Sequence, residues 1–534
     1  MRITTGAKAQ HPDVESSADQ ATDNEDDARE VSERRSRRSF VFFGALAAAT
    51  LMPKASRAQA PSRTRRSMPK EPVDAETGIV PSESVAAFAE WDNPTSRLVR
   101  RATYGITNAE LARASQLGWQ GYVNYQLNYT RINDDAVESV VAAKYPFLAQ
   151  TSDQLFSAAA GDVRNQLVES TIYRAAFSQR QLYQRMVELW SDHFNQDLDK
   201  VGYLLVADQR DVIRKNALGK FPDLLKASAH SASMMLYLDQ SSSRSTAPNQ
   251  NYAREIMELH TLGVDGGYTQ TDVAELSRVL TGWTIQGRGN FIFNPAIHDW
   301  GSKTVLGVTI PAGSPSLGQS GIQEGEKMLD VLANHPSTAR FVGTKMLRWL
   351  LTPDPTETQI STIASVYRAT GGDIKSMIRA ILNDTWLPAA PMKLKRPFHY
   401  LASALRSASP NVSALTPMNQ QLTVLGHPIF SWDTPDGFPD KIEYWAGNIV
   451  PRWGFGTALS NLNSATTLAL DTTLYRAGSP DAAVDLMNQN FFGGEMPTAT
   501  RTALLNYIKA GTFNDARVRE TIALAVSANA FQWY

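Results

Sequence analysis

From about Asn93 onward, apolar residues recur three and four positions apart in almost every segment of this chain. That spacing lines apolar side chains along one side of an α-helix, whereas a half-buried strand alternates with a period of two. Gly or Pro separates successive segments, as it does where short helices end. The pattern predicts an all-α fold over residues 91–534, a large irregular helical domain for which we expect two lobes, 91–318 and 319–534. Helices are expected over 94–103, 107–128, 160–197, 201–216, 249–262, 270–281, 323–333, 336–351, 357–369, 373–384, 394–408, 497–509 and 514–531.

One region, near 284–318, departs from helical spacing. Its segments FIFN (291–294) and KTVLGVTI (303–310) alternate or run β-branched, which is typical of short strands. The sequence therefore predicts a small β-hairpin excursion within the helical domain.

Residues 1–60 have the order of an export signal. A polar, acid-rich leader precedes the pair Arg37-Arg38, a short apolar run extends from Phe40 to Met52, and Ala58-Gln59-Ala60 resembles a cleavage site. The apolar run is too short to span a bilayer as a helix. Paired arginines and mild hydrophobicity favour the twin-arginine route.

This signal indicates the compartment. We expect a periplasmic or secreted protein with no transmembrane anchor after cleavage. Residues 61–90, which are rich in Pro, Ser and Arg, are expected to form a flexible linker.

The composition excludes several classes of site. The chain has 534 residues, a net charge of -1 and no cysteine. Without cysteine there are no disulfides, no iron–sulfur cluster and no covalently attached haem. A near-zero net charge provides no general attraction to nucleic acid. The available ligands are His, Asp, Glu and oxygen donors, which suit one divalent metal ion of hard or borderline character.

The densest group of ionisable side chains lies in residues 251–284. At 100° per residue, Glu255 and Glu258 share one face of a helix, and His260 lies on the opposite, apolar face. Paired carboxylates and an imidazole can carry out acid–base catalysis, so we regard these three residues as candidate catalytic groups.

A structural interpretation of this segment stays open. Arg254 and Glu258 are four positions apart, and Glu275 and Arg278 are three apart, so both pairs could form ion pairs on helix surfaces. In that case the segment would be a helix pair held by charge, without chemistry.

Three histidines form a candidate metal centre. His193 ends an apolar stripe of its helix, His260 lies on the apolar face of another, and His298-Asp299 follows in a loop. Buried imidazoles need partners to offset their desolvation, and a shared divalent ion would supply one. The hypothesis is that His193, His260 and His298 converge, with Asp299 or a nearby glutamate. The alternative is that each histidine meets a separate carbonyl or carboxylate in the core.

A Trp-rich stretch, 426–454, suits either of two roles. Its aromatic side chains could be exposed for stacking on sugars, or packed on the helical body, which is the commoner arrangement.

Several segments carry a resemblance to a known family. Residues 251–284, Trp190 to Phe194, FNPAIHDWGSKTVLG (293–307) and HPSTARFVGTKM (335–346) occur in one order. Through them the chain resembles, from about Thr95 to about Gly454, the bacterial family known as domain of unknown function 1800. The resemblance implies no particular reaction and no catalytic residue. It implies an extracytoplasmic setting with a sulfatase-like partner protein, because the family is often encoded beside one.

Two classes of function fit the sequence. One is an exported, metal-dependent enzyme acting on a small molecule or on an envelope or extracellular polymer. The other is a non-catalytic helical module that binds the sulfatase-like partner or a polysaccharide. The supply of histidines and carboxylates favours the enzyme, and the absence of any familiar catalytic motif counts against it.

Export is expected to depend on Arg37 and Arg38. Replacing both with Lys keeps the charge and removes the paired guanidinium groups, so the precursor should accumulate in the cytoplasm. Immunoblots of periplasmic and cytoplasmic fractions test this. Normal maturation of the double variant would contradict the twin-arginine assignment.

Overall fold

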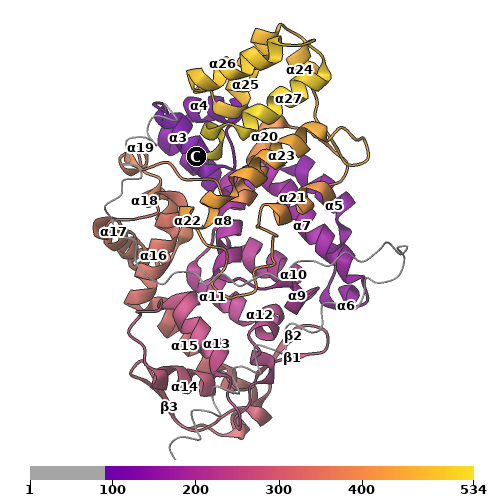
Figure 1. The fold of residues 1–534 in the computed structure, drawn as a ribbon. Helices are drawn as coiled ribbons and strands as arrows, with labels where there is room; N and C mark the ends of the chain where they lie inside the picture. The colour runs from indigo at the N-terminus through magenta and orange to yellow at the C-terminus, as the bar shows by residue number, and fades with distance from the viewer. Residues whose placement is uncertain (1–90) are drawn as a thin grey trace, which may run out of the picture. The chain divides into compact units, whose positions relative to one another are not determined.

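The computed structural model describes residues 91–534, which form an array of short helices with small two-stranded sheets (Figure 1). The all-α prediction is confirmed. The predicted signal at 1–60 and linker at 61–90 lie outside the described residues. All described residues belong to one compact unit, and the division into two lobes stays a prediction. No helix within the described part of the chain is long and apolar enough to cross a bilayer.

The first half of the described chain consists mainly of short helices. They are α3 (Pro94–Ala102), α4 (Asn108–Leu127), α5 (Asp135–Lys144), α6 (Ser152–Leu155), α7 (Ala160–Phe177), α8 (Gln181–His193), α9 (Leu198–Val201), α10 (Leu204–Ala207), α11 (Phe221–Ala229), α12 (Ala232–Tyr237), α13 (Gln250–Glu255) and α14 (Gln270–Val279), with π-helical turns η3 (Asp208–Arg214) and η5 (Ile256–Thr261) and 3-10 turns η1 (Tyr129–Arg131), η2 (Pro146–Ala149) and η4 (Gln240–Ser242).

The second half of the described chain is also built mainly of short helices. Its helices are α15 (Ile322–Asn334), α16 (Pro336–Leu350), α17 (Glu357–Thr370), α18 (Ile374–Ile381), α19 (Trp386–Ala389), α20 (Pro397–Ala408), α21 (Thr416–Val424), α22 (Ile442–Trp445), α23 (Ile449–Asn461), α24 (Thr473–Arg476), α25 (Pro480–Phe492), α26 (Thr498–Lys509) and α27 (Asp515–Ser527), with 3-10 turns η6 (Pro295–Ile297), η7 (Pro315–Gly321), η8 (Ala446–Asn448) and η9 (Asn529–Gln532).

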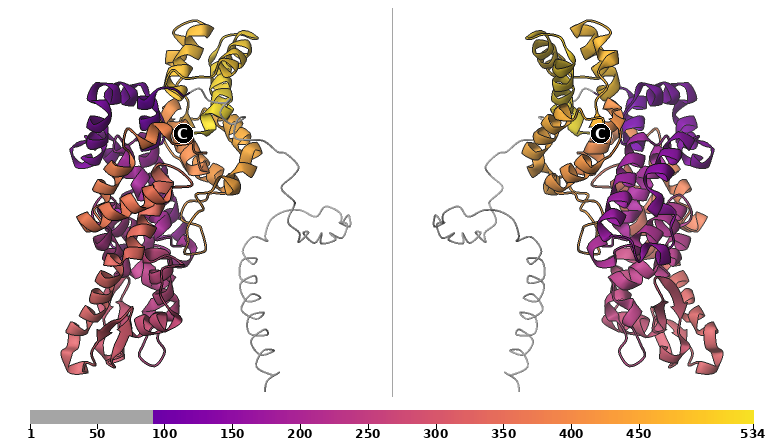
Figure 2. Two further views of the ribbon diagram at one scale, coloured as in Figure 1. Left: turned by 90° about the vertical axis from the view of Figure 1, so that its left-hand side faces the viewer. Right: turned by 90° about the vertical axis from the view of Figure 1, so that its right-hand side faces the viewer.

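The strand region contains two antiparallel hairpins where one excursion was predicted. They are β1 (Trp283–Gln286) with β2 (Asn290–Phe293), and β3 (Lys303–Val305) with β4 (Val308–Ile310). Gly287 and Gly289 supply the positive φ angles of the first turn. Both hairpins lie at the end of this unit away from α24–α27 (Figures 1 and 2). A further short pair, β5 (Asn411–Val412) with β6 (Leu468–Ala469), joins distant segments.

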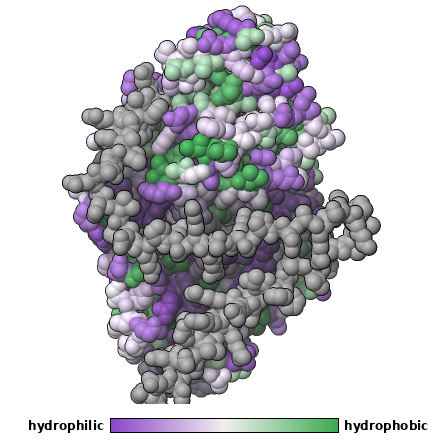
Figure 3. Space-filling view, viewed as in Figure 1, coloured by the Kyte–Doolittle hydropathy of each residue, from purple (hydrophilic) through white to green (hydrophobic). Residues whose placement is uncertain are grey.

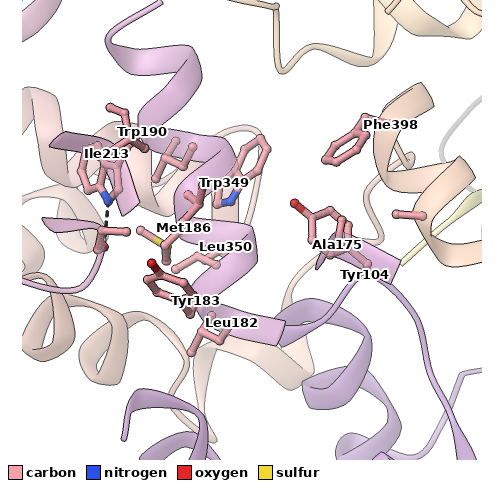
Figure 4. Close-up of a cluster of buried hydrophobic side chains, with 14 of the residues drawn as sticks. Tyr104, Ala175, Leu182, Tyr183, Met186, Trp190, Ile213, Trp349, Leu350 and Phe398 are labelled. Carbon is pink, nitrogen blue, oxygen red and sulfur yellow. Dashed lines mark hydrogen bonds between the residues drawn. The ribbon is translucent and has the colours of Figure 1, made fainter. Parts of the chain in front are cut away.

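Helix α8 is the buried centre of the first half. It packs against α3, α4, α7 and η3, and the indole of Trp349 on α16 donates to its backbone at Arg185 (3.1 Å). Leu182 and Met186 are fully buried, and His193 at the end of the same stripe is 2% exposed. Figure 4 shows side chains of α8 and α16 in one apolar cluster. The predicted stripe is therefore confirmed.

The predicted helix over 160–197 is two helices. Ser178 breaks it, because its hydroxyl donates to Asp134 (2.6 Å) and accepts from the backbone of Arg180 (3.0 Å), and its backbone is extended. Short polar side chains compete with helical hydrogen bonds in this way. The second helix, α8, ends at His193.

Within the predicted helix 249–262, the last residues widen into the π-helical turn η5. The N–H of Leu262 donates to the carbonyl of Met257, five residues back (2.7 Å). Such turns occur often at functional sites. This one carries the candidate residue His260.

Several helices were not predicted from the sequence, among them α25, which has 13 residues. The signals for it were present. Ser479 caps its first turn through Ala482, Pro480 occupies an early position, and Gly493 ends it in the left-handed conformation. These residues mark a helix more clearly than its weak apolar period does.

Replacing Met186 with Ala should destabilise the protein. Removing a fully buried side chain from α8 leaves a cavity, and we expect a loss of about 2–5 kcal/mol in unfolding free energy. The midpoint of urea denaturation measures this. The exposed residue Ser361, changed to Ala, is the control and should stay within about 0.5 kcal/mol of the unmodified chain. An unchanged midpoint for Met186→Ala would show that α8 is not the core element described.

Candidate functional site

A polar cavity of about 740 Å³ lies at the C-terminal end of α8. Its volume is in the range of small-molecule sites. Five segments line it: the end of α8, the C-terminal part of α16, the loop after α16, the start of α20 and the loop that leads into α22. The ionisable lining residues are Asp192, His193, Lys345, Arg348, Asp354, Arg396, Asp436, Asp440, Lys441 and Glu443.

The loop before α22 is fixed against the end of α8. Asn195 donates through its side-chain amide to the carbonyls of Trp432 (2.8 Å) and Thr434 (2.7 Å). Gly437 has a φ of 75°, and a Cβ there would collide with the carbonyl oxygen of Asp192. The close approach therefore requires glycine.

Asp436 is oriented by this same loop. Its Oδ1 accepts from the Thr434 hydroxyl (2.6 Å) and from the Trp432 indole (3.0 Å). Two neutral donors on one oxygen hold the carboxylate in place at the cavity wall.

His193 connects two elements through its two ring nitrogens. Nε2 lies 3.1 Å from the carbonyl oxygen of His260, and Nδ1 lies 3.2 Å from Nζ of Lys345. A carbonyl only accepts, so Nε2 carries the proton and Nδ1 accepts from the lysine. Burial, followed by the charge of Lys345, holds the pKa of His193 well below its usual value. The imidazole is therefore neutral and aims its lone pair at the amine.

The carbonyl of His260 is available because of where it lies. It belongs to the last turn of the helix that ends in η5, and the final carbonyls of a helix have no partner within it. The carbonyl oxygen of His260 is therefore free to accept a hydrogen bond from the ring of His193.

Lys345 is a half-buried cation with no carboxylate within ion-pair distance among the described residues. Burial lowers its pKa to about 8, and the nearby Asp192 and Asp436 offset part of this effect. A lysine with a lowered pKa in a cavity wall is a functional-site candidate.

Asp192 has the opposite shift. Burial raises its pKa to about 6, although Arg396 lies 2.6 Å from Oδ2 and acts to lower it. Arg396 is shared with Glu188, one helical turn earlier on α8, and Glu188 also accepts from the hydroxyl of Tyr104 (2.7 Å). The guanidinium therefore neutralises two carboxylates at once, which leaves Asp192 incompletely compensated.

His260 contributes its backbone to this site, and its ring is buried (1% exposed). Its Nε2 has no hydrogen-bond partner within the described residues. Burial, then Lys345, lowers its pKa to about 3, so the ring is neutral. The ring centroids of His193 and His260 are 6.2 Å apart.

The predicted carboxylate pair lies half-buried on the same helix. Glu258 accepts from the hydroxyl of Tyr268 (3.0 Å). Burial, then the charge of Glu258, raises the pKa of Glu255, and Asp436 adds to this. The pKa of Glu255 therefore responds to its helix neighbour and to a residue of the cavity wall.

The ion pairs considered for this segment form in part. Arg254 donates to Gln270 (2.7 Å), and no ion pair with Glu258 is formed. Arg278 does pair with Glu275 (2.9 Å), as the structural interpretation supposed.

His298 and Asp299 have other partners. Nδ1 of His298 lies 2.6 Å from the carbonyl of Thr281, and Nε2 lies 3.3 Å from Glu324. Asp299 is held by Arg278 (2.7 Å). Burial acts to raise the pKa of this carboxyl, but the hydrogen bonds from Arg278 and the Gly301 N–H, together with the nearby positive charges, lower it.

The contacts therefore connect His193 with His260. The contacts of His298 involve neither of these two histidine rings. Within residues 91–534, no three His, Asp or Glu side chains are grouped as metal ligands. His298 has separate contacts because Thr281 and Glu324 hold its ring. Metal binding by the protein stays a prediction.

The Trp-rich stretch 426–454 combines both arrangements. Phe438 and Trp445 are buried, whereas Tyr444 is 49% and Trp453 56% exposed. Figure 3 shows a hydrophobic area where Figure 1 draws α23. The exposed large apolar residues of α23 are Ile449, Val450 and Trp453.

Sequence reasoning missed Asp192, Lys345 and Asp436. Asp192 directly precedes the candidate His193, and Asp436 lies in a loop with several charged residues. Nothing in the spacing of Lys345 distinguishes it from a surface lysine of an amphipathic helix. Only the packing of α16 against the end of α8 identifies Lys345 as a residue of the site.

The fold and cavity define an all-α protein with a polar site at the end of a buried helix. Residues 97–533 match the family described as "Protein of unknown function (DUF1800)", and the chain belongs to this family. The match extends well beyond the Gly454 limit expected from the sequence motifs. No curated protein and no solved structure matched the chain.

Proposed function

We propose that the protein is an exported acid–base enzyme whose active site is the cavity at the end of α8. In this proposal Asp192 is the general base and Lys345 the general acid, and His193 positions the lysine. The observation that carries it is Lys345: an amine that has no carboxylate partner within residues 91–534 and is held by a neutral imidazole in a polar cavity.

The two pKa values suit this division of roles. With values of about 6 for Asp192 and about 8 for Lys345, most molecules at neutral pH carry a carboxylate and an ammonium group. A base and an acid with pKa values close to the working pH are the most effective ones. In hydrolysis, Asp192 would take a proton from the attacking water, and Lys345 would give one to the leaving group. Solvent then returns both groups to their starting protonation states.

The cavity wall suits a polar substrate. Arg348 and Lys441 add positive charge, and Asp354, Asp436 and Glu443 add negative charge. A small molecule or an envelope or extracellular polymer with hydroxyl and charged groups fits this lining better than an apolar one.

We expect a bell-shaped dependence of turnover on pH, with limbs near 6 and 8. Below the lower limb Asp192 is protonated and cannot act as a base, and above the upper limb Lys345 has lost the proton that it donates. Asp192→Asn and Lys345→Met should each lower kcat by about a hundredfold or more. The full chain would be assayed on a panel of envelope polysaccharides, peptidoglycan and small esters and amides.

Asp384→Asn and Lys327→Met are matched controls, because both residues are exposed and lie outside the cavity. They should keep full turnover. Absence of turnover on every substrate, or full turnover by Lys345→Met, would contradict the proposal.

A metal-dependent enzyme is the second candidate, favoured by the unpartnered Nε2 of His260 beside His193. Two imidazoles 6.2 Å apart between centroids can share an ion at about 2.0–2.1 Å from each nitrogen. His193 would have to exchange one of its present partners for the ion. Elemental analysis separates the candidates: about one metal ion per chain that is lost in His260→Ala favours this candidate, and a metal-free active chain favours the first.

A further inference from the structure

A second cavity, of about 390 Å³, lies between α5, η2, α7, α10 and η3. We call it the α5–α7 chamber, and none of its lining residues lines the cavity at the end of α8. Most of its wall is apolar, including Val141, Leu148, Leu167 and Val206. Its volume suits a small ligand.

Three arginines line the chamber, and two are neutralised. Arg174 makes two hydrogen bonds to Glu138 (3.0 and 2.6 Å), and Arg210 makes two to Asp211 (2.9 and 2.7 Å). A bidentate pair of this kind leaves little charge for a ligand.

Arg214 is the third, and it has no carboxylate partner among the described residues. Its guanidinium donates to the amide oxygen of Gln184 (3.1 Å) and lies 5.3 Å from the ring of Tyr183. Burial lowers its pKa, yet guanidinium groups stay charged in proteins. The chamber therefore holds one uncompensated positive charge.

A buried phenol also lines the chamber. Tyr145 is 4% exposed. Burial, then the charge of the nearby Glu169, raises its pKa, so the phenol stays neutral and adds no charge to the chamber.

We propose that the α5–α7 chamber binds a monocarboxylate with an apolar body, such as a fatty or aromatic acid. The carboxylate would pair with Arg214, and the body would lie against the aliphatic wall. One uncompensated charge matches a single carboxylate and is insufficient for a phosphate dianion. This proposal does not depend on the acid–base function of the other cavity.

The test uses decanoate with the full chain and isothermal titration calorimetry. Decanoate should bind, and decanol, which has the same chain without the charge, should bind at least about tenfold more weakly. Arg214→Gln should weaken decanoate binding by a similar factor. The neighbouring exposed residue, changed as Lys215→Gln, is the matched control and should leave binding unchanged.

A second variant keeps the proposal testable if Arg214→Gln does not fold. Ala142 is exposed at the chamber wall, so Ala142→Trp should fill the chamber and abolish binding without disturbing the core. Circular dichroism checks the fold of each variant. Equal binding of decanol, no binding of decanoate, or unchanged decanoate binding by Ala142→Trp would overturn the proposal.

Discussion

Burial of α8 along most of its surface is the constraint on which the site depends. Each fully buried apolar side chain of this helix contributes about 1.5–3 kcal/mol, and Leu182, Met186 and Trp190 are all fully buried. A helix packed in this way cannot rotate or slide without exposing them. Asp192 and His193, in its last turn, are therefore held in fixed positions at the cavity wall.

The same packing explains the electrostatics of the site. Desolvation destabilises the charged forms of both Asp192 and Lys345, and it moves their pKa values toward neutrality from opposite sides. The end of α8 carries the negative end of the helix dipole, which favours a cation such as Lys345. His193 adds a lone pair that fixes the amine, and no ion pair among the described residues restores its usual pKa.

The sequence predicted the helical architecture better than the site. Apolar spacing identifies long amphipathic helices such as α16, and the stripe that ends at His193 correctly placed that ring in the core. The sequence was enough to suggest that His193 and His260 lie close together, because two buried imidazoles need partners. The position of His298 could not be predicted, because its partners Thr281 and Glu324 come from separate segments that only the fold brings together.

Lys345 shows why the rest of the site could not be predicted. Its lowered pKa is a property of the packing between α16, α8 and the loop that Gly437 allows close to Asp192, not of its own segment. The two π-helical turns, η3 and η5, could not be predicted either. No local sequence pattern distinguishes η5, which carries His260, from an ordinary helix end.

The pKa of Lys345 tests the account most directly. Lysine side chains labelled with carbon-13 can be titrated by NMR in the full chain, and the signal that disappears in Lys345→Met identifies the residue. The account predicts a pKa of about 8. A pKa near the ordinary lysine value of about 10.4 would contradict it, because the amine would then be neither desolvated nor poised as an acid at neutral pH.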